Sequence, residues 1–333
     1  MQKTCSSCRK DFEILEEDKK MYEKIDVPEP EKCFNCRQQH LMAFINHFNL
    51  FQRKCDAKGE IIISNYSPEA PYKVYKMDHW WSDKWDAAEY GTDFDFSRPF
   101  FEQYQELSLK IPRPAVFTAF QYDENSQYTN HSGKDKNCYM IFDSDENRDC
   151  FYSSSINKCN DCCDLYRTRQ SELCYECIDS TTCYNASYLK NCSECRDSAF
   201  LENCRACKNC FMCVNLQHKE YCYMNEYVGK EKFEELMKQL VSGKKIEELK
   251  KQFDEFQQKL PKRYLQIYKS ENSIGNYLNN CKNAYMCFDS GNLWDCRYIT
   301  QSFMNNTKDC IDNVEIGGGA ELIYMTATAG YNA

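Results

Sequence analysis

The spacing of the cysteines constrains this chain more than any other feature of its sequence. Fifteen cysteines lie between residues 138 and 222, and fourteen of them, all but Cys163, stand at positions divisible by three. The other positions of that series are mostly small or apolar, with Asn147 and Lys219 as the exceptions. A period of three fits neither an α-helix nor a simple strand. We therefore expect these side chains to fill the narrow interior of a repeat structure whose chain turns several times in each coil.

The same stretch repeats every twelve residues. The four-residue blocks NCYM at 137–140, DCFY at 149–152 and NCFM at 209–212 share one register. The first residue of such blocks is mostly Asn or Asp, which tolerate turns and left-handed backbone, and the second is Cys, Ser or Ala. Similarity at a fixed period defines a repeat array, whose coils stack at the strand spacing of about 4.8 Å. The sequence thus predicts a mainly β fold built around a narrow β-solenoid with twelve-residue coils and inward Cys, Ser, Ala and Leu.

The repeat resumes near the end of the chain. KNAYMCFDSGNLWDCRY at 282–298 matches KNCYMIFDSDENRDCFY at 136–152, DCID at 309–312 follows after a two-residue insertion, and ELIY comes at 321–324. The sequence ends at GYNA with no obvious capping element, which repeat arrays normally have, so we expect a longer protein. Between the arrays, two apolar stripes with helical spacing predict a helical hairpin that packs on the repeat. The stripes are Phe233, Leu236, Met237 and Leu240, and then Ile246, Leu249, Phe253, Phe256 and Leu260.

Two CxxC pairs near the start predict a metal site. Cys5 and Cys8 form the first pair, and Cys33 and Cys36 form the second, 24 residues further on. Four thiolates suit the tetrahedral coordination of structural zinc and leave no open position for catalysis. The second pair is followed by apolar residues at roughly helical spacing, so we expect it in the first turn of a helix. These apolar residues are Leu41, Phe44, Phe48 and Leu50.

Composition excludes some classes of function and indicates a cellular compartment. The formal charge is −9, which argues against binding nucleic acid mainly by charge. No run of about 18 apolar residues is present, so we expect no membrane span. The first 20 residues lack the apolar core of a secretory signal, and we therefore expect a cytoplasmic protein. In that reducing compartment, cysteines are metal ligands or buried thiols before they are disulfides.

The segment before the repeat is rich in aromatic residues. It contains a strand-like run at Ile61–Ile63, a helical run at Phe100–Leu109, and three of the four tryptophans at positions 80, 81 and 85. We interpret the tryptophans as a small core rather than an aromatic cage. The predicted organisation is a zinc ribbon at 1–49, an aromatic-rich α+β subdomain at 50–120, a β-solenoid at 121–228, a helical hairpin at 229–263 and a second, truncated solenoid segment at 264–333.

Parts of the sequence resemble a known family. CSSCRKDFEILEEDKKMYEKIDVPEPEKCFNCR, with its two CxxC pairs, its central YEK and its VP segment, resembles the probable zinc-ribbon domain family. WWSDKWDAAEYGTDFDFSRPFFEQ, the Cys-rich repeats and HKEYCYMNEYVGKEKFEEL resemble uncharacterised Cys-rich zinc-ribbon proteins of candidate-phyla bacteria. The resemblance implies that Cys5, Cys8, Cys33 and Cys36 bind Zn²⁺, and it implies no activity.

Three functions fit these patterns. The first is a non-enzymatic, zinc-binding scaffold whose outward aromatic column contacts a protein partner or a carbohydrate; the column comprises Tyr139, Phe151, Tyr175, Phe211 and Tyr223. The second is a Cys-rich metal-binding or thiol-redox protein, suggested by CRACKNCFMC at 204–213. The third is a carbohydrate-active solenoid enzyme with a carboxylate pair from Asp143, Asp145, Asp161 and Asp164. We favour the first, because Asp recurs at the turns of such a repeat for conformational reasons and no catalytic motif accompanies it.

Overall fold

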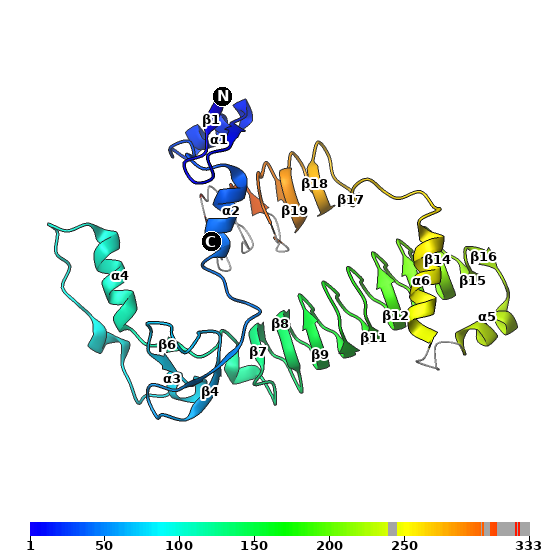
Figure 1. Cartoon of the computed structure of the whole chain (residues 1–333), viewed down its shortest axis with the longest axis horizontal. Coiled ribbons are helices and arrows are strands. Elements are labelled where there is room, and N and C mark those ends of the chain that lie inside the picture. The colour runs from blue at the N-terminus through cyan, green and yellow to red at the C-terminus, as the bar shows by residue number, and fades with distance from the viewer. Residues whose placement is uncertain (239–244, 301, 303–306, 312–323, 325, 327–333) are drawn as a thin grey trace. The chain divides into compact units, whose positions relative to one another are not determined.

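The computed structural model describes residues 1–238, 245–300, 302, 307–311, 324 and 326. Across these residues the fold is mainly β, with one ten-stranded sheet, several small sheets and six α-helices (Figure 1). The chain divides into two compact units, one formed by residues 1–46 with 262–333 and the other by residues 47–261. Leu240 of the first predicted stripe, and the block ELIY apart from Tyr324, lie outside the described residues. None of the described helices is long and apolar enough to cross a membrane.

The ten-stranded sheet forms most of the larger unit, and we call it the first stack. Its strands pair in sequence order. They are β7 (Thr129–Gly133), β8 (Tyr139–Asp145), β9 (Arg148–Ser154), β10 (Asn160–Cys163), β11 (Glu172–Tyr175), β12 (Tyr184–Lys190), β13 (Arg196–Glu202), β14 (Lys208–Val214), β15 (Glu220–Tyr223) and β16 (Glu226–Tyr227). From β7 to β15 every pairing is parallel, and only β16 returns antiparallel to β15.

The predicted twelve-residue register is confirmed in the first stack. Cys150 pairs with Cys162, and Cys210 pairs with Cys222, so cysteines of successive coils lie above one another. Parallel strands usually need a long crossover connection, and here each coil of twelve residues supplies the return. The residues of the three-residue series are nearly all buried, and their thiols and apolar side chains form one continuous core.

A corner in the backbone explains the period of three. Every third residue from His131 to Met224 has a positive φ, between 44° and 61° for these positions, and nearly all of them stand directly before an inward-facing residue. The left-handed conformation costs L-residues roughly 1–2 kcal/mol, and Asn and Asp bear it best. This accounts for the Asn and Asp in the first column of the repeat. Residues such as Phe200 adopt the same conformation because the stacked neighbours hold the backbone there.

Two helices cover part of the first stack. They are α5 (Lys230–Met237) and α6 (Ile246–Gln257), and they lie in the stretch where the sequence predicts helices. Phe233, Leu236, Leu249 and Phe253 are buried in one cluster with outward side chains of β13 and β14. The prediction that the stripes pack on the repeat is therefore confirmed.

The segment before the first stack forms small elements of its own. These are β3 (Phe51–Lys54), β4 (Ile61–Ser64), β5 (Val74–Tyr75), α3 (Met77–Trp80), α4 (Phe100–Lys110) and β6 (Arg113–Pro114), with short 3₁₀ turns η1 (Ala87–Tyr90) and η2 (Phe120–Tyr122). β3 pairs with β4 in an antiparallel hairpin, and β5 pairs with β6. The predicted strand at Ile61–Ile63 and the predicted helix at Phe100–Leu109 are both confirmed.

The smaller unit joins the two ends of the sequence. Its elements are β1 (Gln2–Thr4), β2 (Asp11–Glu13), α1 (Glu16–Lys24), α2 (Phe34–Met42), β17 (Ile267–Tyr268), β18 (Ile274–Asn279), β19 (Tyr285–Gly291), β20 (Leu293–Trp294) and β21 (Thr307–Lys308). We call β17 to β21 the second stack. Ile14, Met21 and Tyr22 share a core with Tyr298 and Ile311 of this stack, a contact that the sequence did not suggest.

The coils of the second stack vary in length. Ile267 pairs with Leu278, eleven residues away, whereas Leu293 pairs with Thr307, fourteen residues away. The longer interval is the two-residue insertion seen in the sequence. At the shorter coil, a Cβ on Gly275 would stand 1.8 Å from the carbonyl oxygen of Cys287, and the φ of Gly275 is +157°. Only glycine allows the two coils to approach so closely.

One helix is shorter than the sequence predicts. α2 ends at Met42, with Ala43 as its C-cap, so the apolar spacing does not continue as helix to Leu50. Phe44 and Phe48 are 72% and 53% exposed. The ring of Phe48 instead lies 5.9 Å from that of Phe142, and Leu50 packs on the core that contains Val74 and Met77. These side chains therefore pack outside the helix, and tertiary packing, more than propensity, maintains helices in proteins.

Candidate metal centre and aromatic face

A tight turn positions the first cysteine pair. Between β1 and β2, the amide of Cys5 donates to the carbonyl oxygen of Lys10 at 2.9 Å, and the amide of Arg9 donates to the carbonyl oxygen of Cys5 at 3.0 Å. Arg9 closes the turn with a φ of 62°. The turn leaves the amide of Cys8 3.5 Å from the Cys5 sulfur. Both thiols of the pair are thereby held on one side of the hairpin.

A helix start positions the second pair. Cys33 is the N-cap of α2 and Cys36 lies in its first turn, as the sequence predicts. The amide of Cys33 donates to the Cys5 sulfur at 3.3 Å, which ties the helix start to the hairpin. The positive end of the helix dipole favours anionic ligands at this position.

The four thiols converge. Their sulfur atoms all lie within 4.8 Å of one another, and the sulfurs of Cys8 and Cys33 are 3.8 Å apart. Tetrahedral Zn–S bonds of about 2.3 Å place sulfurs at about that separation. Cys5, Cys8, Cys33 and Cys36 therefore form a group that can hold a metal ion, compatible with a zinc-ribbon-like site.

Electrostatics also favour a cation at this point. Backbone hydrogen bonds, led by that from Cys8, lower the pKa of Cys5 to about 6, although its burial opposes the shift. Burial and the neighbouring thiols raise the pKa of Cys36 to about 11. Four thiols so close together cannot all ionise without a compensating charge, and a bound cation supplies that charge.

A row of ion pairs and hydrogen bonds connects helix α1 to the second stack. Asp18 is 2% exposed, accepts a hydrogen bond from the hydroxyl of Tyr298 at 2.9 Å and pairs with Arg297. Lys24 pairs with Asp309 at 2.6 Å. These contacts anchor the segment between the two CxxC pairs.

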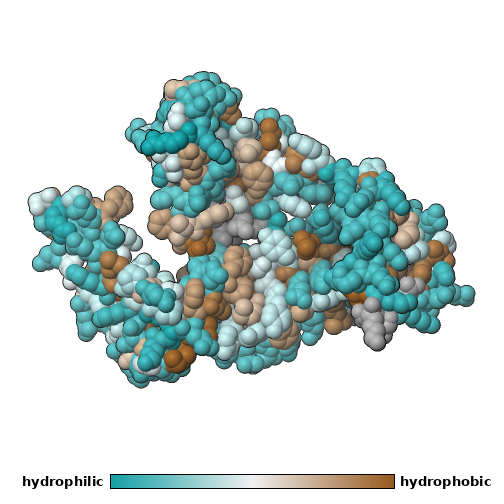
Figure 2. Space-filling model, in the orientation of Figure 1, coloured by the Kyte–Doolittle hydropathy of each residue, from teal (hydrophilic) through white to brown (hydrophobic). Residues whose placement is uncertain are grey.

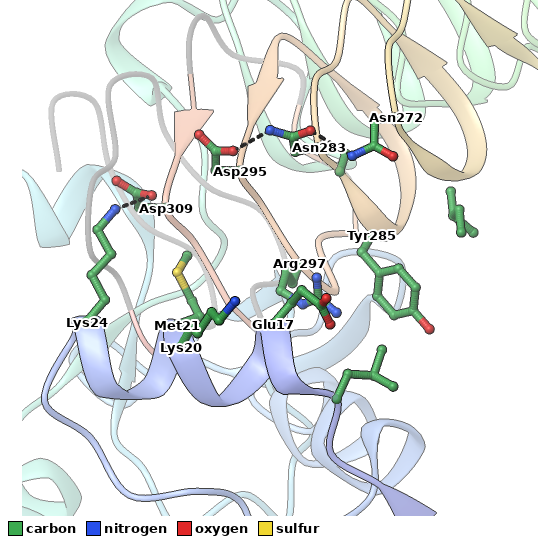
Figure 3. Close-up of a pocket in the computed structure, with 13 residues that line it drawn as sticks. Glu17, Lys20, Met21, Lys24, Asn272, Asn283, Tyr285, Asp295, Arg297 and Asp309 are labelled. Atoms are coloured by element: carbon green, nitrogen blue, oxygen red, sulfur yellow. Dashed lines mark hydrogen bonds and ion pairs between the residues drawn. The ribbon is translucent and has the colours of Figure 1, made fainter.

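A pocket of about 710 Å³ lies beside this contact (Figure 3). On one wall, Asn272 donates to Asn283 at 2.9 Å and Asn283 donates to Asp295 at 2.7 Å. Lys24 and Arg297, which also line it, already face the carboxylates of Asp309 and Asp18. The polar side chains of the walls thus bind one another, and the pocket offers little converging chemistry for a ligand.

The predicted aromatic column divides into two parts. Tyr139, Phe151 and Tyr175 are 39–40% exposed, whereas Phe211 is only 1% exposed. Tyr223 is partly buried and stacks on Phe211 with ring centroids 5.7 Å apart. The chain's own helices cover the last two rings of the column.

Rings of the neighbouring column, one residue further along each coil, complete an aromatic face that is interrupted at Cys163 and Asp164. We call its exposed part the open half and its buried part the covered half. The open half comprises Tyr128, Tyr139, Phe151, Tyr152 and Tyr175, and the covered half comprises Tyr188, Phe200, Phe211, Met212 and Tyr223. Tyr175 and Tyr188 join the halves with centroids 5.6 Å apart. The viewed surface of the molecule is largely hydrophilic with scattered apolar patches (Figure 2).

The cysteines inside the first stack differ from those of the metal centre. The sulfur of Cys162 lies 3.0 Å from the carbonyl oxygen of Asn160, and most interior thiols repeat this contact with the residue two positions earlier. Burial raises the pKa of Cys159 and of Cys183 to about 12. At Cys159 and Cys183 the thiol is therefore held protonated and acts as a packing residue.

A third group of polar residues was not predicted. His47, His131 and Asp143 offer ligand atoms within 4.8 Å of one another, and His131 Nδ1 lies 3.0 Å from Asp143 Oδ1. The two imidazole rings stack in parallel, with centroids 3.9 Å apart and an interplanar angle of 7°. Ring nitrogens bind metals in the plane of the ring, so two parallel rings do not converge on one ion. Burial lowers the pKa of His47 to about 4, which keeps this ring neutral in the stack.

Comparison with known proteins adds no identity. No protein-family model matches the chain, and no curated protein matches it. The similarity of the N-terminal motif to the zinc-ribbon family therefore stays a resemblance, and function has to be argued from the residues themselves.

Proposed function

We propose that this chain is a non-enzymatic, zinc-containing scaffold of the cytoplasm, in which a β-solenoid presents the open half of its aromatic face to a partner protein. The observation that carries the proposal is the division of one ring row into a covered and an open half. Phe200 and Phe211 are 2% and 1% exposed under α5 and α6, whereas Tyr152 in the open half is 59% exposed. Large rings in a row on a solvent face mark an interaction site.

The proposed metal is Zn²⁺, bound by Cys5, Cys8, Cys33 and Cys36 in a zinc ribbon. Four protein ligands fill a tetrahedral shell, so the ion would stabilise the fold and take no part in a reaction. Helix α1, between the two pairs, packs on the second stack through Met21 and Tyr22. The proposed ribbon thus holds together a unit built from the two ends of the sequence.

The alternative functions receive less support from the geometry. A thiol-redox or metal role for the interior cysteines conflicts with their burial and with the raised pKa values of Cys159 and Cys183. Of the four aspartates considered for a carbohydrate-active enzyme, Asp143 already bonds to His131 and accepts from Ser155 at 2.8 Å. Neither alternative explains the open half.

Quantitative co-purification tests the proposal. The tagged full chain, its Tyr139→Ala/Tyr175→Ala variant and a Tyr184→Ala control would be expressed in the source cells and compared by mass spectrometry. Tyr184 is 42% exposed on the same stack but lies outside the aromatic face. We expect at least one protein to be depleted about tenfold with the double variant alone, as for loss of a hot-spot ring. If the same proteins are recovered with all three forms, the open half is not a binding surface.

A further inference from the structure

The way in which α6 covers the aromatic face shows what the open half can accept. Leu249 and Phe253, one helical turn apart, are 3% and 8% exposed, and the ring of Phe253 lies 5.9 Å from that of Phe200 in an edge-to-face contact. Phe256 and Leu260 continue the same stripe at the margin of the cluster. The covered half thus binds the apolar stripe of an amphipathic helix, with positions i, i+4 and i+7 as its anchors.

A charged contact fixes this helix at the border between the halves. Lys250 Nζ lies 3.1 Å from Glu176 Oε2 and 5.2 Å from the ring centre of Tyr188. Hydrogen bonding to Glu176 raises the pKa of Lys250, which keeps the ammonium group charged. One lysine beside the apolar stripe therefore meets both a carboxylate and a ring face of the stack.

The open half offers a carboxylate next to a ring in the opposite order: Tyr152 lies one coil before Asp164, whereas Tyr188 lies one coil after Glu176. Asp164 stands twelve residues before Glu176, at the equivalent position of the preceding coil, and is exposed. The rings of Tyr139 and Tyr152 flank that position in the coils before it, 5.6 Å apart at an angle of 85°. Tyr175 links this surface directly to the covered half. The surface next to α6 thus also combines rings with a carboxylate, as does the site on which α6 is bound.

We infer that the open half binds an amphipathic helix of a partner protein that carries a Lys or Arg beside its apolar stripe. This inference rests on the proposed function, because it names the partner chemistry of the same face. Edge-to-face rings form grooves for apolar side chains, whereas sugars and bases stack on exposed ring planes. The nearby carboxylates of Asp149, Asp161 and Asp164 also oppose a nucleic-acid backbone.

A peptide with the sequence of α6 provides a probe for this surface. A fluorescent peptide of residues 246–260, stapled on its polar face to keep it helical, would be titrated into the full chain and followed by anisotropy. We expect saturable binding that weakens about tenfold in the Tyr139→Ala/Tyr152→Ala variant and is unchanged in Tyr184→Ala. A peptide with Lys250→Glu should bind several-fold more weakly, because its charge then opposes Asp164.

The other outcomes overturn the inference. A basic amphipathic helix on the open half is excluded if the peptide does not bind. It is also excluded if binding changes neither with Tyr139→Ala/Tyr152→Ala nor with the charge of residue 250. Self-association of the chain that Tyr139→Ala/Tyr152→Ala abolishes would make a second copy the occupant. Saturable binding of an oligosaccharide or a short oligonucleotide at the same tyrosines would change the class of ligand.

The two proposals fail in different ways. If a protein co-purifies through Tyr139 and Tyr175 but the peptide does not bind, the scaffold function stands and only the helix is wrong. If no protein depends on these rings in cells while the peptide binds in vitro, the surface accepts a helix but the proposed function fails.

Discussion

The chain builds the same hairpin-and-helix arrangement twice, once with converging thiols and once without. The Cys5 module comprises β1, β2 and α2 with their connections (residues 2–42), and the Cys55 module comprises β3, β4 and α3 (residues 51–80). In the Cys55 module, the amide of Cys55 donates to the carbonyl oxygen of Glu60 at 2.8 Å and the amide of Gly59 donates to that of Cys55 at 2.8 Å. These bonds repeat those of Cys5 with Lys10 and Arg9. Gly59 has a positive φ of 75°, and Arg9, at the equivalent position, has a positive φ of 62°.

The correspondence extends to the helix. The amide of Lys76, the N-cap of α3, donates to the Cys55 sulfur at 3.4 Å, as Cys33 does to the Cys5 sulfur. When the two modules are aligned by these hydrogen bonds, Lys58, Lys76 and His79 correspond to Cys8, Cys33 and Cys36. The two lysines lie 3.8 Å and 3.9 Å from Asp78, so an ion-pair cluster stands where the thiols would be.

The Cys55 module has a hydrophobic core at this hairpin. Cys55, Ile62, Val74 and Met77 are buried together with Ala115 and Val116, which the pairing of β5 with β6 brings in. The strands of the Cys5 module have only three residues each, and none of these is buried. The same hairpin geometry therefore occurs both with four converging thiols and with a packed core in their place.

Metal removal should separate the modules most strongly. With Cys33→Ser, or with a chelator, the Cys5 module should lose its hydrogen-exchange protection, because structural zinc contributes about 10–16 kcal/mol of apparent binding energy. The Cys55 module should keep its protection in the same sample. Elemental analysis should show one zinc per chain in the wild type and in Cys55→Ser, and none with Cys33→Ser. Zinc retained by Cys33→Ser would contradict the site.

The second prediction restores the missing ligands. Lys58→Cys/Lys76→Cys places two thiols beside Cys55 and His79, and His79 Nδ1 is buried without a hydrogen-bond partner among the described residues. A set of three Cys and one His is an established structural zinc set. We expect two zinc ions per chain and higher thermal stability of the larger unit with zinc. The single variant Lys58→Cys is the control and should bind one; one zinc in both would show that the two modules differ in more than their ligands.

Acid should affect only the module with converging thiols. Backbone hydrogen bonds lower the folded-state pKa of Cys5 from the ordinary thiol value of 9.0 to about 6, so this thiolate contributes stability above pH 9 that is lost as pH falls through about 6. Protons also compete with the metal for the thiolates. We expect zinc release, and loss of exchange protection in residues 2–42, below about pH 6. Equal loss in residues 51–80 over this range would contradict the comparison.

The smallest effect should come from truncating the buried thiol itself. Cys55→Ala removes one buried sulfur that accepts from Lys76, and we expect a loss of about 1–2 kcal/mol in the free energy of unfolding of the larger unit. Denaturant titration followed by tryptophan fluorescence would measure it. Zinc content should not change. A loss several times larger would indicate that Cys55 does more than fill the core.

Some of this architecture could be read directly from the sequence. The interior of the first stack admits only small or apolar side chains, so Cys150, Cys162 and their equivalents reveal the twelve-residue register. The thiols of the metal centre were also predictable, because each CxxC pair is a local turn or helix start. Both signals arise from neighbouring residues and need no knowledge of the rest of the chain.

Other parts depend on contacts between distant residues. Tyr298 donates to Asp18 across 280 positions of sequence, and His131 meets His47 across 84. Neither pair has a characteristic spacing. The sequence does not reveal the Cys55 module, because cysteine occupies only one of the four positions that correspond to the thiols of the Cys5 module. The equivalence of the two modules appears only in their backbone hydrogen bonds.

The sequence by itself determined which side chains face the interior of the first stack, because a narrow bore sets residue size at every third position. It did not determine which of the outward rings are covered. Tyr139 and Phe211 occupy equivalent positions of the repeat, and yet one is 39% exposed and the other 1%. Tertiary structure decided this difference, since α5 and α6 fold back over only one part of the ring row and exclude water there.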